Sequence, residues 1–221
     1  MTFRGFSTEA IDFYARLEAD NTKSFWGANK AIYESYVKAP FEELSAALEP
    51  EYGTLKLFRP YRDARFSKDK TPYKIHAGVA GEMEGGAVVY VQLSKTGLFV
   101  GTGYYMMATD QLARFRTAID NENSGTELEG LLKDLTRAKY SLDADALKTA
   151  PRGYPKDHPR IELLRRKWMT AGKDFGAPAW LHTGKTIDRI RAVFTAAGPL
   201  NEWLDLHVGP STMPPENWGR D

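Results

Sequence analysis

The stretch GGAVVYVQLSKTGLFV at residues 85–100 decides the fold class. Residues 87–93 alternate apolar with polar residues near their end, and residues 98–100 resume the apolar run after the short turn SKTG. Two strands separated by a short turn that contains glycine predict an antiparallel hairpin. The glycines between 97 and 103 fit turns and close backbone approach, because GTGYY lacks the strand–loop–helix context of a dinucleotide-binding loop.

Apolar residues at helical spacing precede this hairpin. Residues 6–17 form the first expected helix, with Ser7 as its N-cap. Asn21–Thr22 cap a second helix, and Pro40 either interrupts it or starts the next helical piece. The first fifty residues are therefore predicted to be helical.

Helical spacing returns after the hairpin, at residues 112–119 and 128–135. The segment APRGYPKDHP at 150–159 is a loop by its Pro and Gly content, and Asp157 is expected to cap a helix that continues to the basic residues 165–167. Two further helices complete this half of the chain, one at 183–194 and a short one that Pro199 begins.

Helices, then strands, then helices again predict an α+β fold. Strands are also expected at 55–58 and 73–80, so the central sheet should be mostly antiparallel, with N-terminal and C-terminal helices packed on it. We expect a single domain over residues 1–208. Residues 209–221 are rich in proline and polar residues and are expected to form a poorly ordered tail.

Composition excludes several classes of site and partner. The chain of 221 residues has no cysteine, which excludes disulfides, thiolate metal sites and cysteine nucleophiles. Its 4 histidines have no metal-ligand spacing, and no motif calls for a cofactor, so we expect neither a metal nor a cofactor. No apolar run approaches the ~20 residues of a membrane span, so a soluble, cytoplasmic protein without a membrane partner is expected. The net charge of +1 argues against a general polyanion binder.

A basic stretch interrupts the strand region. Residues 58–74, FRPYRDARFSKDKTPYK, hold six cations against two aspartates, a local charge of 6 − 2 = +4. Cations held close together repel one another, and a bound anion or neighbouring carboxylates would relieve that repulsion. We therefore predict a site for a small phosphate- or carboxylate-bearing ligand, with Tyr73 orienting the ligand and Asp63 holding an arginine in place. The expected ligand-binding cations are Arg59, Arg62, Arg65, Lys68 and Lys70.

Two other interpretations of this stretch stay open. In one, Asp63 and Asp69 form ion pairs with the arginines, and the cluster braces a structural or protein-interaction module. In the other, aromatic residues among the cations bind nucleic acid, which the near-neutral charge disfavours. Whether a reaction follows binding is open as well; Asp63 or His158 would then move a proton, with Arg152 beside His158 joining the ligand-binding set. The oligomeric state is not predicted.

The run Arg59-x-x-Arg62-Asp63-x-Arg65-Phe66-x-x-Asp69-Lys70-x-x-Tyr73 resembles the signature of the family called domain of unknown function 2461. The opening FSTEAIDFYARLEADNTKSFW, then GLFVGTGYY and APRGYPKDHPRIELLRRK, match it as well, so the resemblance covers nearly all of the chain. The resemblance implies membership but brings no catalytic residue and no cofactor. A signature built from Arg, Asp, Lys and Tyr raises the weight of an anion site relative to a plain solvated surface.

Overall fold

A computed structural model describes residues 2–63, 65, 69–142 and 144–213. Within these residues one antiparallel sheet runs in chain order, with each strand beside the next. The fold is α+β, as the sequence predicts. The strands are β1 (Lys56–Leu57), β2 (His76–Glu82), β3 (Val88–Ser94), β4 (Gly97–Tyr104) and β5 (Met169–Gly176).

The N-terminal part is helical, as expected. The Thr22 hydroxyl caps the second helix by accepting a hydrogen bond from the backbone N–H of Phe25 at 3.1 Å. Pro40 does not break the chain's helical course, because it lies in the first turn of the third helix, where its missing N–H costs no hydrogen bond. The elements are α1 (Thr8–Ala19), α2 (Lys23–Tyr33), the π-helical segment η1 (Glu34–Lys38) and α3 (Ala39–Tyr52).

The C-terminal part contains two departures from the sequence-based expectation. The helix expected through residues 165–167 is a single turn that ends at Leu164, after which Arg165 Nε donates to the carbonyl of Leu147 at 2.6 Å. Strand β5, which the sequence reading missed, then follows. The helices are α4 (Thr109–Asp120), α5 (Glu122–Arg137), α6 (Ile161–Leu164), the 3-10 turn η2 (Ala179–His182), α7 (Lys185–Ala196) and α8 (Gly198–His207).

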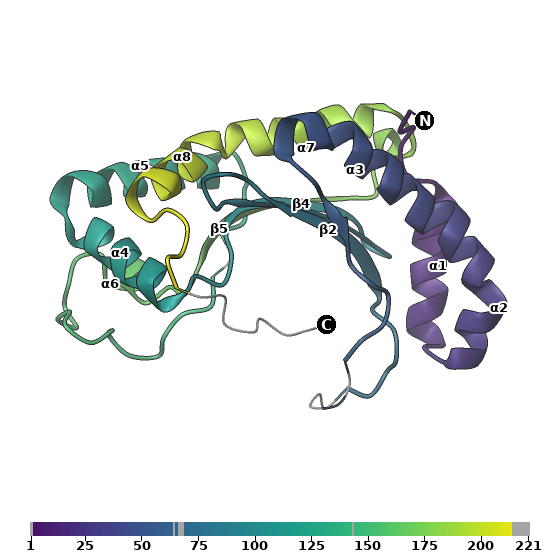
Figure 1. Ribbon diagram of the computed structural model, residues 1–221, viewed down its shortest axis with the longest axis horizontal. Coiled ribbons are helices and arrows are strands. Elements are labelled where there is room, and N and C mark those ends of the chain that lie inside the picture. The colour runs from purple at the N-terminus through teal and green to yellow at the C-terminus, as the bar shows by residue number, and fades with distance from the viewer. Residues whose placement is uncertain (1, 64, 66–68, 143, 214–221) are drawn as a thin grey trace.

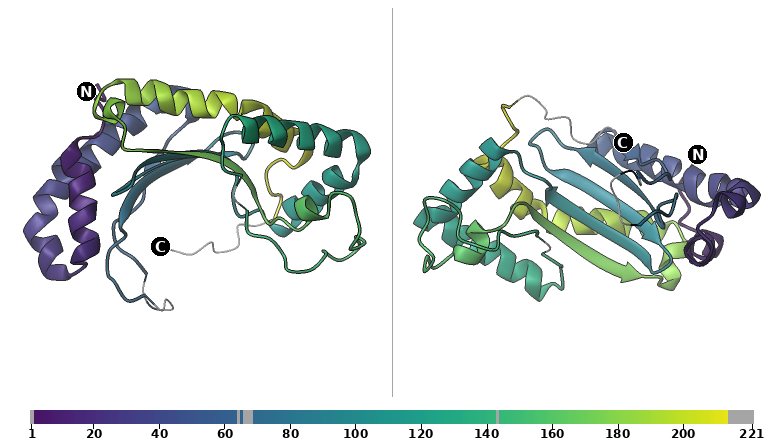
Figure 2. Two further views of the ribbon diagram at one scale, coloured as in Figure 1. Left: turned by 180° about the vertical axis from the view of Figure 1, so that it is seen from behind. Right: turned by 90° about the horizontal axis from the view of Figure 1, so that it is seen from below.

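The two faces of the sheet have different surroundings. Helices α3, α7 and α8 cross one face, and the sheet arches beneath them (Figure 1). Seen from below in the right panel of Figure 2, the other face shows its strands with no helix laid across them. The pair α1–α2 flanks one end of this open face and α4–α6 the other (Figure 1).

Close backbone approach explains the glycine at position 103. Gly103 has a positive φ of 133°, and a Cβ atom there would lie 2.3 Å from the carbonyl oxygen of Met169 on the neighbouring strand. A side chain would therefore separate β4 from β5. The structural role predicted for the glycines of GTGYY is confirmed at this position.

The first residues of the expected tail are bound to α4. Gln111 Nε2 donates to the carbonyl of Gly209 at 3.0 Å, and Asp110 accepts hydrogen bonds from the hydroxyl of Ser211 at 2.7 Å and the N–H of Thr212 at 2.8 Å. The backbone N–H of Thr212 is the main cause that holds the pKa of Asp110 well below its usual range. These hydrogen bonds attach residues 209–212 to α4, whereas residues 214–221 of the expected tail lie outside the described residues.

None of the helices among the described residues combines the length and the apolar character needed to cross a membrane.

Candidate functional site

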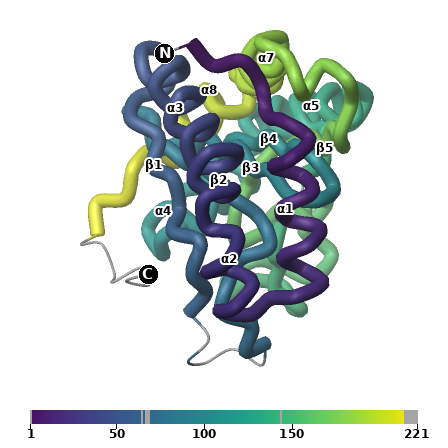
Figure 3. The backbone as a smooth tube through the Cα atoms, turned by 90° about the vertical axis from the view of Figure 1, so that its right-hand side faces the viewer, coloured from purple at the N-terminus to yellow at the C-terminus, as the bar shows by residue number. Residues whose placement is uncertain are grey.

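The basic stretch forms the connection between β1 and β2, which we call the arginine-rich loop (residues 58–75). Its two arms pair with each other: the N–H of Arg62 donates to the carbonyl of Pro72 at 2.9 Å and that of Lys74 to Pro60 at 2.8 Å. The side-chain amide of Asn21 binds both the N–H and the carbonyl of Tyr73. The loop therefore runs alongside α2, below the sheet (Figure 3).

Two arginines of the loop form ion pairs within it. The Arg62 guanidinium binds the carboxylate of Asp69, whose other oxygen accepts from the N–H and the hydroxyl of Thr71 at 2.9 and 2.8 Å. Asp63 holds Arg65 by accepting from its Nε at 2.9 Å and its Nη2 at 2.5 Å. These are pairs of the kind that the bracing interpretation requires.

The other loop residues of the predicted site differ in exposure and in their contacts. Arg59 and Lys70 have exposed side chains, and Lys70 Nζ donates to the carbonyl of Arg65 at 3.4 Å. Lys68 lies outside the described residues. Tyr73 is 5% exposed, and its ring stacks on Trp26 with a centroid distance of 4.4 Å and an interplanar angle of 9°. The ring anchors the loop to α2, so we do not assign it to the orientation of a ligand.

His158 and Arg152 do not lie beside the arginine-rich loop. Their segment belongs to the connection on the α4–α6 side, at the opposite end of the sheet in both Figure 1 and Figure 2. His158 Nδ1 accepts from the N–H of Arg160 at 3.0 Å, and its Nε2 lies 3.0 Å from Asp120. These contacts of His158 fix a turn against the end of α4, and the structure does not bring this residue to the arginine-rich loop.

A cavity of about 570 Å³ lies on the open face of the sheet, which we call the open-face cavity. Successive residues of a strand point to opposite faces, so the alternate positions of β2 to β5 form its floor. Aromatic side chains from the strands and the segments that flank them form much of its lining. They are Phe58, Tyr90, Phe99, Tyr105 and Trp168.

Two glycines let aromatic rings lie close against the sheet. A Cβ atom at Gly172 would lie 2.4 Å from Cζ of Phe99, so the Phe99 ring occupies the space that a side chain there would need. Likewise, a Cβ atom at Gly78 would lie 2.8 Å from the hydroxyl of Tyr90. The Tyr90 hydroxyl donates to Gln92 Oε1 at 2.7 Å. The two rings therefore occupy the space above the strands that side chains at Gly78 and Gly172 would fill.

One end of the cavity is basic. Lys74 and His76 line it, and the Lys74 ammonium lies 5.6 Å from the ring centroid of Phe58. Burial, and then the charges of Lys74 and Arg62, lower the pKa of His76. Among the described residues that line the cavity there is no Asp or Glu.

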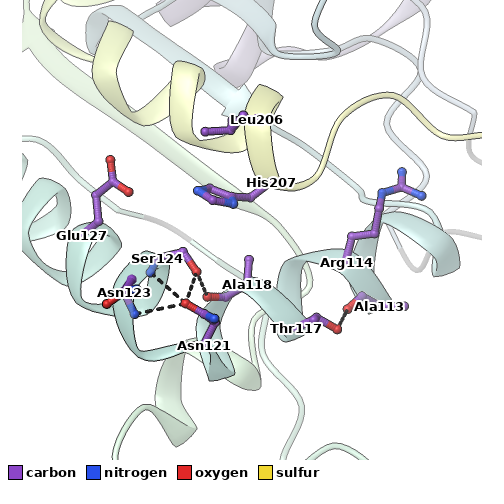
Figure 4. A pocket seen from close by; sticks show the side chains of 10 residues that line it. All are labelled: Ala113, Arg114, Thr117, Ala118, Asn121, Asn123, Ser124, Glu127, Leu206 and His207. Atoms are coloured by element: carbon purple, nitrogen blue, oxygen red, sulfur yellow. Dashed lines mark hydrogen bonds between the residues drawn. The ribbon is translucent and has the colours of Figure 1, made fainter.

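A second cavity, of about 620 Å³, lies between α4, α5 and the end of α8 (Figure 4). Arg114 and Glu127 bring opposite charges to it, and Arg114 Nη2 donates to the carbonyl of Pro210 at 2.8 Å. The His207 ring points toward α5, and its buried Nε2 makes no hydrogen bond within the described residues. This cavity has no Phe, Tyr or Trp among its described lining residues, and its lining includes a carboxylate, unlike that of the open-face cavity.

The described part of the chain contains no cluster of three His, Cys, Asp or Glu side chains that could hold a metal ion. The chemistry of the open-face cavity is therefore that of aromatic rings, an ammonium and an imidazole.

Sequence reasoning missed most of the open-face cavity because its residues come from four strands. A signal was present: Tyr90 and Phe99 alternate with valine and leucine in the hairpin, on the face opposite to its apolar residues. Aromatic residues at the outward positions of an otherwise well-formed sheet indicate a binding surface more directly than local charge does. The register that brings Gly172 beneath Phe99 has no local signature.

No curated protein matches the chain. A family model described as "Conserved hypothetical protein (DUF2461)" matches residues 9–203, which include the paired arms of the arginine-rich loop and all five strands. The matched region covers most of the 221 residues. The chain therefore belongs to the conserved hypothetical protein family DUF2461.

Proposed function

We propose that this protein binds a small ligand whose phosphate or carboxylate group lies at the basic end of the open-face cavity. One observation carries the proposal: Lys74 and His76 line a largely apolar cavity that has no acidic residue among its described lining. A cation in such a setting attracts an anion more strongly than it would in bulk water, because the low polarity weakens screening.

The ion pairs of the arginine-rich loop support this arrangement. Arg62 and Arg65 are held by Asp69 and Asp63, which fixes the paired arms from which Lys74 continues into β2. The exposed side chains of Arg59 and Lys70 are the loop's candidates for a second contact with the anion.

The proposal is one of binding and assigns no reaction. The Nε and Nη2 atoms of Arg65 both donate to the Asp63 carboxylate, so we assign Asp63 the role of holding Arg65 and not that of a proton carrier. His158 is engaged at the other end of the sheet.

A thermal-shift titration with phosphate- and carboxylate-bearing metabolites tests the proposal. At a ligand concentration of 100 Kd, binding should add about 2.7 kcal/mol of stability, which raises the Tm of a chain of this size by about 5 to 10 °C. Lys74→Met should weaken binding by at least about tenfold, because a charge-assisted hydrogen bond is lost. Lys133→Met, an exposed lysine on α5, is the matched control and should keep the affinity.

The proposal fails if no anion raises the Tm of the wild-type protein, or if Lys74→Met and Lys133→Met bind equally well. The second candidate, a bracing role for the arginine-rich loop alone, rests on the two ion pairs. It predicts that Arg62→Ala lowers stability while no anion changes the Tm.

A further inference from the structure

The open-face cavity contains far more aromatic surface than an anion alone would need. The rings of Phe58, Tyr90 and Phe99 follow one another across the sheet, with centroid distances of 6.4 and 6.2 Å. Tyr105 and Trp168 form a second group, 5.2 Å apart. Both groups line the open-face cavity. Burial, and then the neighbouring Tyr105, raises the pKa of Tyr90 to about 12.

These rings are not core residues that happen to lie near a surface. Phe58 is 42% exposed and Tyr105 is 58% exposed, whereas a packed core would exclude water from both. Tyr105 is followed by Met106, a non-glycine residue with a φ of 54°. Backbone in this left-handed region costs about 1 kcal/mol or more and persists where the surrounding structure holds it. The backbone is therefore strained at the residue that follows Tyr105, whose side chain lines the open-face cavity.

The rings of the first group lie close against the strands at different tilts. Gly78 and Gly172 lie beneath Tyr90 and Phe99, where a side chain would meet the rings. The planes of Phe58 and Phe99 make angles of 45° and 55° with that of Tyr90, so the group presents both ring faces and ring edges to the cavity. A planar aromatic group can make stacked and edge-to-face contacts with such a lining, which an aliphatic group of the same size cannot.

We infer that the ligand of the open-face cavity carries a planar aromatic ring joined to its anionic group. The ring stacks among Phe58, Tyr90 and Phe99, and the anion lies beside Lys74, whose ammonium is 5.6 Å from the Phe58 centroid. The shared chemistry is that of an aryl carboxylate or an aryl phosphate. This inference rests on the proposed function and adds the chemical class of the ligand.

A set of matched probes separates the two ideas. 2-Naphthoate is planar and anionic, decahydronaphthalene-2-carboxylate keeps the charge without the planar ring, and 2-naphthamide keeps the ring without the charge. Calorimetric titration should give 2-naphthoate or 2-naphthyl phosphate a Kd at least about tenfold lower than either of the other two. The better of these two aryl anions identifies the anionic group.

Each of the other outcomes contradicts either the aromatic inference or the proposed anion site. If the saturated carboxylate binds as tightly as 2-naphthoate, the aromatic inference fails and the anion site stands. If the amide binds as tightly, the proposed anion site fails and the aromatic inference stands. If no naphthyl probe binds, the aromatic inference fails whatever smaller anions do.

Two substitutions place the probe in the cavity. Tyr90→Leu and, independently, Tyr105→Leu remove a ring while keeping apolar volume, and each should raise the Kd of the better naphthyl anion by about threefold to tenfold. Tyr36→Leu, which changes an exposed tyrosine of η1, should leave the Kd unchanged. Because Tyr105 is 58% exposed, its substitution should leave the protein folded even if that of Tyr90 does not. Equal affinity in all three variants would exclude this cavity as the site.

Discussion

The two faces of one sheet make a controlled comparison, because the same strands supply both. On the covered face, Val91, Leu93 and Val100 are fully buried under the helices. On the open face, the alternate residues Tyr90 and Phe99 remain partly accessible. Aliphatic side chains fill the covered face as tightly as an organic crystal, whereas rings over glycines leave space on the other. Along each strand, alternate residues therefore stabilise the fold on the covered face and line the cavity on the open face.

The largest expected effect is a test of this division. Leu93→Ala on the covered face should lower the free energy of unfolding by about 2 to 5 kcal/mol, because it leaves a cavity among packed helices and strands. Gln92→Ala, one residue earlier and on the open face, should change it by less than about 1 kcal/mol. Urea denaturation of both variants measures the difference. Equal losses would contradict the contrast between the two faces.

A glycine substitution on the open face should have the next largest effect. In Gly172→Ala the new methyl group would lie 2.4 Å from the end of the Phe99 ring, so the ring must tilt into the open-face cavity. We expect a loss of about 1 kcal/mol in stability, because the ring has room to move, together with a loss of ligand affinity.

Gly130→Ala is the matched control for Gly172→Ala. Gly130 lies within α5, and nothing lies within 4 Å of a Cβ atom there. The substitution should therefore stabilise the protein by about 0.5 to 1 kcal/mol. Urea midpoints of the two variants should shift in opposite directions, and a shift in the same direction would show that the Phe99 ring does not need Gly172.

A smaller effect is expected from the ion pair between Arg62 and Asp69. Their side chains are 26% and 52% exposed, so solvent screens the pair. A double-mutant cycle with Arg62→Ala and Asp69→Ala should give a coupling free energy of about 0.2 to 1 kcal/mol. A coupling of zero would remove the bracing role from this pair.

The smallest expected effect is on the pH dependence of the free energy of unfolding, compared between the wild-type protein and His76→Gln. Because the pKa of His76 is lowered in the folded protein, the unfolded chain binds the proton more readily. Its contribution to stability is complete above the unfolded pKa of about 6.5 and is lost as the pH falls below that value toward the lower folded pKa. The stability of the wild-type protein relative to His76→Gln should therefore decline between pH 7 and pH 5. Parallel curves would contradict the shift.

Part of this molecule could be predicted from sequence for clear physical reasons. The hairpin around Gly97 and the helix capped by Thr22 follow from local turn chemistry, capping and periodicity, and the structure contains both. Strand β5, MTAGKDFG, could not be found in this way, because it contains two glycines and only one aromatic residue. Pairing with β4 stabilises it, and such pairing has no local signal.

Part of the candidate site could likewise be predicted from the sequence, and part could not. The density of charge in the sequence predicted a site in the arginine-rich loop. Two arginines of the loop form ion pairs with Asp69 and Asp63. The loop cation that lines the cavity is Lys74, near the start of β2. A count of charges cannot distinguish a paired guanidinium from one that faces a cavity. Nor could the sequence separate His158 from the loop, since that separation depends on the path of the chain around both ends of the sheet.

The backbone pairing of Ser141 with Gly172 limits the access of another strand to one edge of the sheet. Ser141 exchanges both of its backbone hydrogen bonds with Gly172, at 2.8 and 2.9 Å, and so occupies part of the outer edge of β5. At the opposite edge, β1 is only two residues long and is soon followed by Pro60. Both borders of the sheet thus offer little room for a strand from another molecule. Among the described residues, one broad face of the sheet has no helix across it, while both edges of the sheet are protected from pairing with a strand of another molecule.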